Sequence, residues 1–66
     1  MWNYRVIYDP DDFEYPYYIG EVYYDEEGEP TFYSGPMEVS GESFNEVVEE
    51  FEKMAAALDK EVLEAW

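Results

Sequence analysis

The distribution of acidic residues most restricts how this chain can fold. There are 18 Asp and Glu side chains among 66 residues, against three basic residues and no histidine, which gives a formal net charge of -15. A net charge of about 2 to 8 in magnitude keeps a small domain soluble, so solubility alone does not require this excess. Because like charges repel most strongly in a compact state, the acids must lie on the surface around an apolar core.

A folded core is expected because the apolar residues are numerous and patterned. Hydrophobic residues make up 47% of the chain and aromatic residues 21%, and large rings bury much apolar area in few residues. At this length we expect one domain, residues 1–66. Such a domain buries only about 60% of the surface that its unfolded chain exposes, so its stability is marginal.

Three aromatic-rich runs predict β-strands. Residues Trp2–Asp9 alternate strand-forming and polar side chains until a proline ends the run. Tyr17–Tyr24 is the second run, and Gly20 within it indicates a bulge or a close approach of another backbone. The acidic stretch with a glycine at 25–29 predicts a hairpin loop, after which Thr31–Tyr33 is the third strand.

One amphipathic helix follows the strands. Ser43 with Glu46 three residues later is a capping box, and apolar residues then recur every three or four positions. This helix stripe consists of Phe44, Val47, Val48, Phe51, Met54, Ala55 and Leu58. The helix either ends at Asp59 or Lys60 or continues into residues 61–66, and the sequence leaves both alternatives open.

Together these elements predict an α+β fold of the order β-β-β-α. A three-stranded antiparallel meander carries the C-terminal helix on one face. The helix stripe must be buried, and the sheet is the only partner that the chain offers it. The sheet face away from the helix then exposes part of the tyrosine content. Residues Met37–Val39, between the third strand and the helix, form either a short edge strand or a loop.

The composition argues against an enzyme. Without histidine and cysteine, the chain lacks the commonest general base, a thiol nucleophile and the usual zinc ligands. The oxygen-rich stretches at 9–14 and 25–29 do not match a calcium-binding EF-hand loop, because Gly20 and Pro36 stand where the closing glutamate belongs. We therefore expect no catalytic residue, no metal and no cofactor.

The carboxylates fall into three sets, which we call the first, second and third acidic groups. The first follows the first strand, the second lies at the hairpin tip with one member in the second strand, and the third runs along the helix. Their members are Asp9, Asp11, Asp12 and Glu14; then Glu21, Asp25, Glu26, Glu27 and Glu29; then Glu42, Glu46, Glu49 and Glu50, with Glu52 next to them. We expect these carboxylates to contact the partner.

Charge spaced along a folded scaffold predicts a mimic of nucleic acid. Duplex DNA carries one charge per about 1.7 Å of axis, so the net charge of this chain matches about 25 Å of duplex. We expect a stoichiometric inhibitor whose carboxylates stand in for phosphates and occupy the nucleic-acid-binding surface of a positively charged protein. Direct binding to nucleic acid or to an anionic membrane is not expected, because like charges repel.

A small protein-binding module is the alternative. In that case a tyrosine-rich sheet face or an unpaired strand edge carries recognition, as in an antitoxin-like or other regulatory partner, or joins two copies of the chain. We expect a monomer, with a homodimer as the second option. The sequence shows neither a signal-peptide pattern nor an apolar run of about 18 residues, which predicts a cytoplasmic protein.

Two resemblances add to these expectations. The chain resembles a family of short uncharacterised bacterial proteins, which implies no function. The frame that carries this likeness is Trp2–Val6, Glu21–Asp25, Gly28, Pro30, Gly41–Ser43, Glu52, Met54, Ala57, Leu58 and Lys60.

In size, acidity and sheet-plus-helix plan, the chain also resembles the small anti-CRISPR proteins of phages, in particular the type I-C inhibitors. Some of these proteins act as DNA mimics on type I surveillance complexes. The resemblance implies a subunit of a CRISPR effector as the target and, for a phage-encoded protein, the host cytoplasm as the location. It rests on overall character, so no individual binding residue is carried over.

Overall fold

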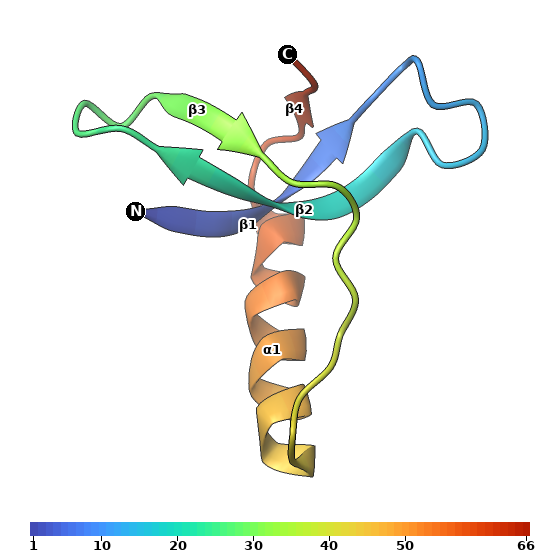
Figure 1. The fold of residues 1–66 in the computed structure, drawn as a ribbon, viewed down its shortest axis with the longest axis vertical. Coiled ribbons are helices and arrows are strands. Elements are labelled where there is room, and N and C mark those ends of the chain that lie inside the picture. The colour runs from blue at the N-terminus through green and yellow to red at the C-terminus, as the bar shows by residue number, and fades with distance from the viewer.

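The computed structural model describes residues 1–66 and has the α+β architecture that the sequence predicts (Figure 1). In chain order the elements are β1 (Trp2–Tyr8), β2 (Tyr17–Tyr24), β3 (Pro30–Tyr33), helix α1 (Phe44–Ala56), one 3-10 turn η1 (Ala57–Asp59) and β4 (Leu63–Glu64). The strands form one sheet in the order β3-β2-β1-β4. The molecule measures 34 × 34 × 19 Å, so it is broad and thin.

The antiparallel meander of β1, β2 and β3 is present as predicted. β1 and β2 pair along their whole length, with Trp2 opposite Tyr23. β3 continues the meander on β2, where Phe32 lies opposite Tyr23, and the register shifts between Tyr23 and Tyr24. The predicted strands are therefore confirmed to within one residue at each end.

Gly20 is explained by a close approach, one of the two reasons that the sequence offered. It is buried in β2 opposite Arg5. A Cβ atom at this position would lie 3.0 Å from Cδ1 of Ile7 and 3.1 Å from the carbonyl oxygen of Ser34. The register shift lies elsewhere, so the bulge alternative is wrong for this glycine.

The prediction of three antiparallel strands is incomplete, because β4 adds a fourth. It runs parallel to β1, with Leu63 opposite Ile7, and the N–H of Ala65 donates to the carbonyl oxygen of Tyr8 at 2.8 Å. The residues after η1 therefore do not continue the helix, and the sheet is mixed. A two-residue strand is too short to show the period-2 pattern by which strands are recognised in sequence.

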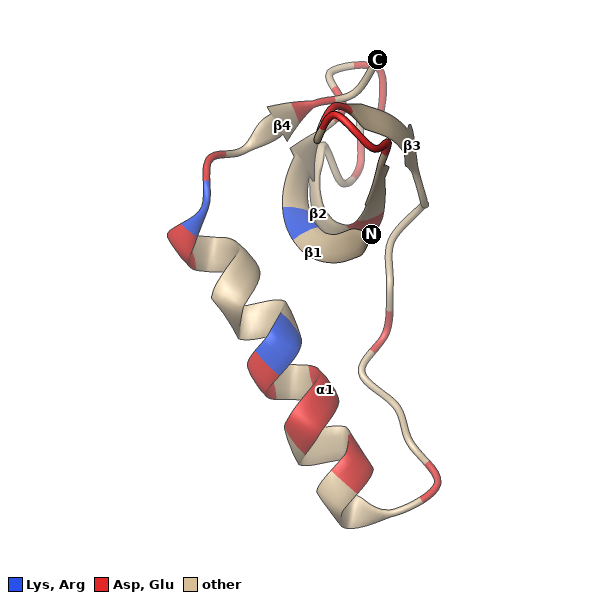
Figure 2. Ribbon diagram, turned by 90° about the vertical axis from the view of Figure 1, so that its left-hand side faces the viewer, with Lys and Arg blue, Asp and Glu red and all other residues tan.

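The four strands curl around an inner face (Figure 2). Ile7 and Val22 have no solvent exposure on this face. Residues beyond β4 close one side of it, since the ring of Trp66 lies 4.6 Å from that of Tyr33 and the Tyr33 hydroxyl donates to the Trp66 carbonyl oxygen at 3.1 Å. The sheet thus forms an apolar core of its own, without the helix.

The single arginine is used inside this curl. Nη1 of Arg5 donates to the hydroxyl of Tyr24 at 3.1 Å, and Nη2 donates to the carbonyl oxygen of Glu61 at 2.5 Å. The Tyr24 hydroxyl in turn donates to Oδ1 of Asn3 at 2.8 Å. Arg5 therefore ties the segment before β4 to the sheet and pairs with no carboxylate.

Helix α1 begins where the capping box predicts. Oγ of Ser43 accepts the N–H of Glu46 at 3.2 Å, and Oε2 of Glu46 accepts the N–H of Glu42 at 3.1 Å. The first of these bonds satisfies a backbone donor that a helix start otherwise leaves unpaired, and the second ties the residue before the cap to the first turn. The α-helix ends at Ala56, two residues before the last apolar member of the stripe, and η1 completes the turn.

The prediction that the sheet buries the helix stripe is wrong for most of the stripe. Met54 is the only buried residue of α1, and it packs with Ala57 against Tyr4 of β1. The helix meets the sheet near its C-terminal end, and its first turns project away (Figures 1 and 2). Phe44 and Phe51 are 81% and 61% exposed. A curled sheet offers a narrow outer face, so only the last turns of the helix find cover.

Residues Met37–Val39 form a loop and not an edge strand. They belong to the segment that connects β3 to α1. The N–H of Met37 donates to the carbonyl oxygen of Ile19 at 3.0 Å, which fastens the start of this segment to β2. Met37 and Val39 are exposed, so the loop contributes little to either core.

Candidate protein-binding surfaces

The first acidic group lies in the loop between β1 and β2, and two of its members shape that loop. Oδ1 of Asp9 accepts the N–H of Asp11 at 3.0 Å. Oδ1 of Asp12 accepts the N–H groups of Glu14 and Tyr15 at 3.1 and 3.0 Å. Such side-chain bonds to the following backbone are turn-forming. The carboxylates of Asp11 and Glu14 remain exposed to solvent.

The second acidic group forms the hairpin between β2 and β3. Oδ1 of Asp25 accepts the N–H groups of Glu27 and Glu29 at 2.9 and 3.0 Å. Gly28 supplies the positive φ of 83° that the turn needs, a conformation that residues with a side chain rarely adopt. Asp25 therefore organises the tip, and the carboxylates of Glu26, Glu27 and Glu29 point into solvent.

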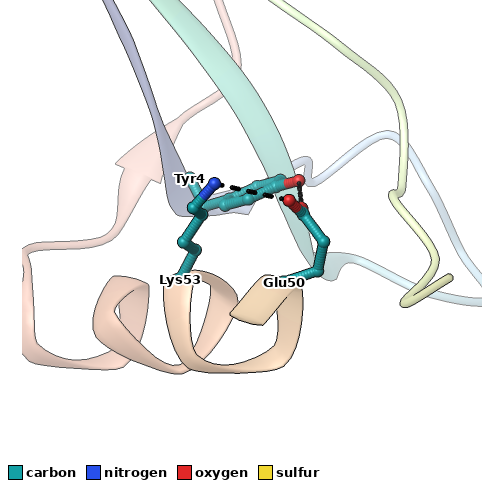
Figure 3. Close-up of polar contacts among 3 residues, drawn as sticks. All are labelled: Tyr4, Glu50 and Lys53. Atoms are coloured by element: carbon teal, nitrogen blue, oxygen red, sulfur yellow. Dashed lines mark hydrogen bonds and ion pairs between the residues drawn. The ribbon is translucent and has the colours of Figure 1, made fainter. Parts of the chain in front are cut away.

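The third acidic group lies on α1 and, in the case of Glu42, just before its cap, and one member fastens the helix to the sheet. Oε2 of Glu50 accepts the hydroxyl of Tyr4 at 2.6 Å, and Oε1 lies 3.5 Å from Nζ of Lys53 (Figure 3). The contact with Lys53 is the one ion pair in the molecule. Glu42 and Glu49 are exposed, so nearly all of the negative charge has no internal counter-charge.

The Tyr4–Glu50 hydrogen bond also sets the ionisation of both groups. The bond from the hydroxyl to the carboxylate, together with burial of the ring, raises the pKa of Tyr4 to about 12. The same bond holds the pKa of the Glu50 carboxyl below its usual value. Glu50, which is half-buried, is therefore committed to the fold, whereas Glu49 and Glu52 of the helix have no side-chain partner within the chain.

The three acidic groups occupy three separate corners of the molecule (Figures 1 and 2). The first and second lie at opposite ends of β2, and the third lies on the projecting helix. Glu21 lies within β2, apart from the hairpin tip, where its carboxylate accepts the hydroxyl of Tyr23. The fold thus spreads the sequence-predicted site residues and does not gather them. Those without an internal side-chain partner are Asp11, Glu14, Glu26, Glu27, Glu29, Glu42 and Glu49.

Exposed aromatic rings form a row across the outer face of the sheet. Trp2, Tyr23 and Phe32, which we call the outer aromatic row, lie on adjacent strands with ring centroids 6.4 and 5.7 Å apart. Trp2 and Tyr4 are two residues apart in one strand, so they share a face. The exposed aromatics therefore lie beside the helix, and the prediction that the opposite face exposes them is wrong.

Sequence reasoning did not single out Trp2 or Phe32 as surface residues. Both occur in aromatic-rich runs, where every ring looks equally suited to a core. Their exposure depends on strand register, which places both opposite Tyr23, and on where the helix meets the sheet. Neither the register nor the position of the helix can be read from the pattern of a single strand. The strand pairing that the hairpin loop implies could, however, have predicted the register and so the alignment of the three rings.

A shallow hollow between β1 and α1 concentrates the basic side chains. It has a volume of about 400 Å³ and is lined by Trp2, Asn3, Tyr4, Lys53, Ala56 and Lys60. Both lysines of the chain lie here, so the acidic surface is interrupted on this side. We therefore expect a basic partner to contact the acidic groups at the corners of the molecule and not this hollow.

The remaining surface offers carboxylates and apolar area. No cluster of three or more acidic side chains has the arrangement needed to hold a metal ion. Neither helical segment has the length and apolar character needed to cross a membrane.

No protein-family model, curated protein or solved structure matches this chain.

Proposed function

We propose that this protein is a stoichiometric inhibitor that binds the nucleic-acid-binding surface of a basic protein and excludes the nucleic acid. The observation that carries the proposal is the display of carboxylates on three corners of one fold with a single internal ion pair. Uncompensated charge on structured turns and on a capped helix presents a partner with anions at fixed positions. Lys and Arg side chains recognise such anions through charge-assisted hydrogen bonds.

The charge density supports competition with a duplex. At one charge per about 1.7 Å, a duplex segment of about 25 Å carries the net charge of this protein. The molecule extends 34 Å in two directions, which is the same scale. The separation of the groups favours an extended basic surface as the target, because a small basic patch would meet only one corner of this broad, thin molecule at a time.

The resemblance to small anti-CRISPR proteins makes a type I CRISPR effector the first purified target to assay. Such an effector holds nucleic acid in positively charged channels. The proposal itself concerns any basic nucleic-acid-binding protein, and the cytoplasm is the compartment in which we expect the two to meet.

A protein-binding module that uses the outer aromatic row is a second candidate. Trp2, Tyr23 and Phe32 are each more than one third exposed and lie in contact across three strands. Aromatic residues are enriched where protein interfaces are buried. Binding of this kind resists salt, whereas binding through carboxylates weakens steeply as salt increases.

Capture from a nuclease-treated lysate of the cells in which the gene is found tests the proposal. We expect the immobilised protein to retain basic proteins that are released by excess duplex DNA and by added salt. Retention that neither treatment reverses would contradict nucleic-acid mimicry. A loss of that retention in Phe32→Ser would then assign it to the outer aromatic row.

Charge reversal then identifies which corner makes contact. Each double reversal to Lys changes the net charge equally, and none touches a carboxylate that shapes a turn. The variants are Asp11/Glu14, Glu26/Glu27 and Glu49/Glu52, with Glu38/Glu64 as the matched control outside the three groups. We expect at least one of the three pairs to weaken binding well beyond the control, whereas equal effects would show that only the overall charge matters.

A further inference from the structure

The exposed part of the helix stripe has the spacing of a helix–helix seam. Phe44, Val48, Phe51, Ala55 and Leu58 follow one another at alternating intervals of four and three residues, the pattern of the apolar a and d positions of a coiled coil. Val48 is 38% exposed and Leu58 is 68% exposed, in addition to the two phenylalanines. The seam therefore runs for about 20 Å along α1 and η1, and its large side chains remain partly exposed, whereas Ala55 is half-buried.

The helix itself has reason to be covered. α1 has 13 residues, and only Met54 near its end is buried. Isolated helices of about 12 to 15 residues are marginal in water, and tertiary packing normally stabilises them. The first turns of α1 have the cap at Ser43 and a half-buried Val47 but no buried side chain, so a partner on the seam would supply stabilisation that the fold lacks.

The charges beside the seam indicate what kind of partner fits. In the heptad register that makes the seam a and d, the e positions on its solvent side are Asn45, Glu52 and Asp59. The g positions on the other side are Val47, which is half-buried, and Met54, which packs against Tyr4 of β1. Charged residues at e and g positions determine which helices pair in a coiled coil. The acidic residues at the e positions therefore favour a partner helix that places Lys or Arg opposite them.

From these observations we infer that the seam is a docking site for an α-helix of a basic partner protein. The partner helix carries an apolar stripe bordered by Lys or Arg, and it packs along Phe44, Phe51 and Leu58 while its cations meet Glu52 and Asp59. A second copy of this chain is a poor occupant, because it brings the same charge of -15. The inference rests on the proposed function only in that the partner is basic. It adds apolar contact along the seam to the binding through carboxylates that the proposed function describes.

Two synthetic peptides test the site directly. The first is a peptide of about three heptads with Leu at a and d and Lys at e and g; the second has the same composition in an order that destroys the heptads. We expect the parent protein to bind the heptad peptide about tenfold or more tightly than the scrambled one, by fluorescence anisotropy at physiological salt. Equal affinity for both would overturn the inference, because charge alone would then explain binding.

Matched variants locate the binding. Phe51→Ser removes a seam residue, and Phe13→Ser removes a ring that is 98% exposed in the β1–β2 loop. Phe51→Ser should weaken heptad-peptide binding about tenfold with an unchanged far-ultraviolet dichroism spectrum, whereas Phe13→Ser should change it less than about twofold. Glu52→Lys keeps the apolar seam and should also weaken binding. Equal binding by the parent and Phe51→Ser would place the peptide elsewhere and overturn the inference.

Three further outcomes separate this site from its alternatives and from the proposed function. A parent dimer in sedimentation equilibrium that Phe51→Ser dissociates would make a second copy the occupant and overturn the basic-helix partner. DNA-reversible capture from lysate with no preference for the heptad peptide would leave the proposed function standing and overturn the seam. Heptad binding without DNA-reversible capture would support the seam and contradict the proposed function.

Discussion

The curled sheet and helix α1 use their apolar residues in opposite ways. The sheet buries Ile7 and Val22 completely on its inner face, whereas α1 buries Met54 and leaves Phe44 and Phe51 in solvent. Both elements carry a clear amphipathic pattern. The difference shows that such a pattern identifies the residues that share a face, while the shape of the neighbouring elements decides whether that face is covered inside the chain or by a partner.

The largest expected effect concerns the inner face of the sheet. Ile7→Ala should lower the free energy of unfolding by about 3 kcal/mol, because it opens a cavity at a residue with no solvent exposure. A chain of this length has a total stability of about 3 to 10 kcal/mol, so the variant should lose about a third or more of it. Urea unfolding followed by tryptophan fluorescence measures the change. A loss below about 1 kcal/mol would contradict close packing inside the curl.

A second change tests how tightly the sheet curls. Gly20→Ala should destabilise by about 2 kcal/mol, because its Cβ would press on Ile7 and on the Ser34 carbonyl oxygen. Gly35→Ala is the matched control, since a Cβ there meets nothing within 4 Å, and we expect it to be neutral or slightly stabilising. Equal stability of the two variants in urea would mean that the sheet accommodates a Cβ atom at position 20 without strain.

The junction between the two regions should depend on pH. The pKa of Tyr4 is raised from 10.0 to about 12 in the folded state, so the hydrogen bond to Glu50 contributes fully below pH 10 and is lost as the pH rises from 10 to about 12. The stability difference between the parent and Tyr4→Phe should disappear over that interval. Tyr15→Phe, which alters an exposed ring, serves as the control.

The stability difference between the parent and Tyr4→Phe should also disappear at low pH. The pKa of Glu50 is lowered in the folded state, so its contribution is present above the unfolded pKa and is lost as the pH falls through the folded pKa. A difference between the parent and Tyr4→Phe that is independent of pH at both ends would contradict the hydrogen bond.

The smallest expected effect concerns the exposed seam. Phe51→Ser should change the free energy of unfolding by no more than about 0.5 kcal/mol, because the ring is already solvated and the two residues have similar helix propensity. Thermal unfolding of the parent and the variant measures the difference. A loss above about 1 kcal/mol would show that the sheet covers this part of the helix and would remove the contrast between the two regions.

Local signals predicted much of the fold. Alternation and turn chemistry located β1, β2 and β3, and the Ser43 cap located the start of α1. β4 was missed because its hydrogen bonds join residues at distant positions in the chain, and its two residues carry no pattern. The placement of the helix was also wrong, since the curl that narrows the outer face arises from all four strands together.

The candidate site shows the same difference between features set by local sequence and features set by contacts between distant residues. The sequence placed the acidic groups correctly on two turns and on the helix. That Asp9, Asp12 and Asp25 serve their own turns follows from local chemistry and was within reach of sequence reasoning. The role of Glu50 was not, because it depends on Tyr4, which is distant in sequence and becomes a neighbour only after folding.

The parallel pairing of β4 with β1 has a consequence for the order of folding. Ile7 and Leu63 are separated by nearly the whole described chain, and closing so long a loop costs more conformational entropy than forming a hairpin. The meander and the capped helix can therefore assemble from near neighbours while one edge of β1 stays open. Docking of β4 completes the sheet. Because Trp66 contacts Tyr33 in the folded sheet, tryptophan fluorescence can follow this last step.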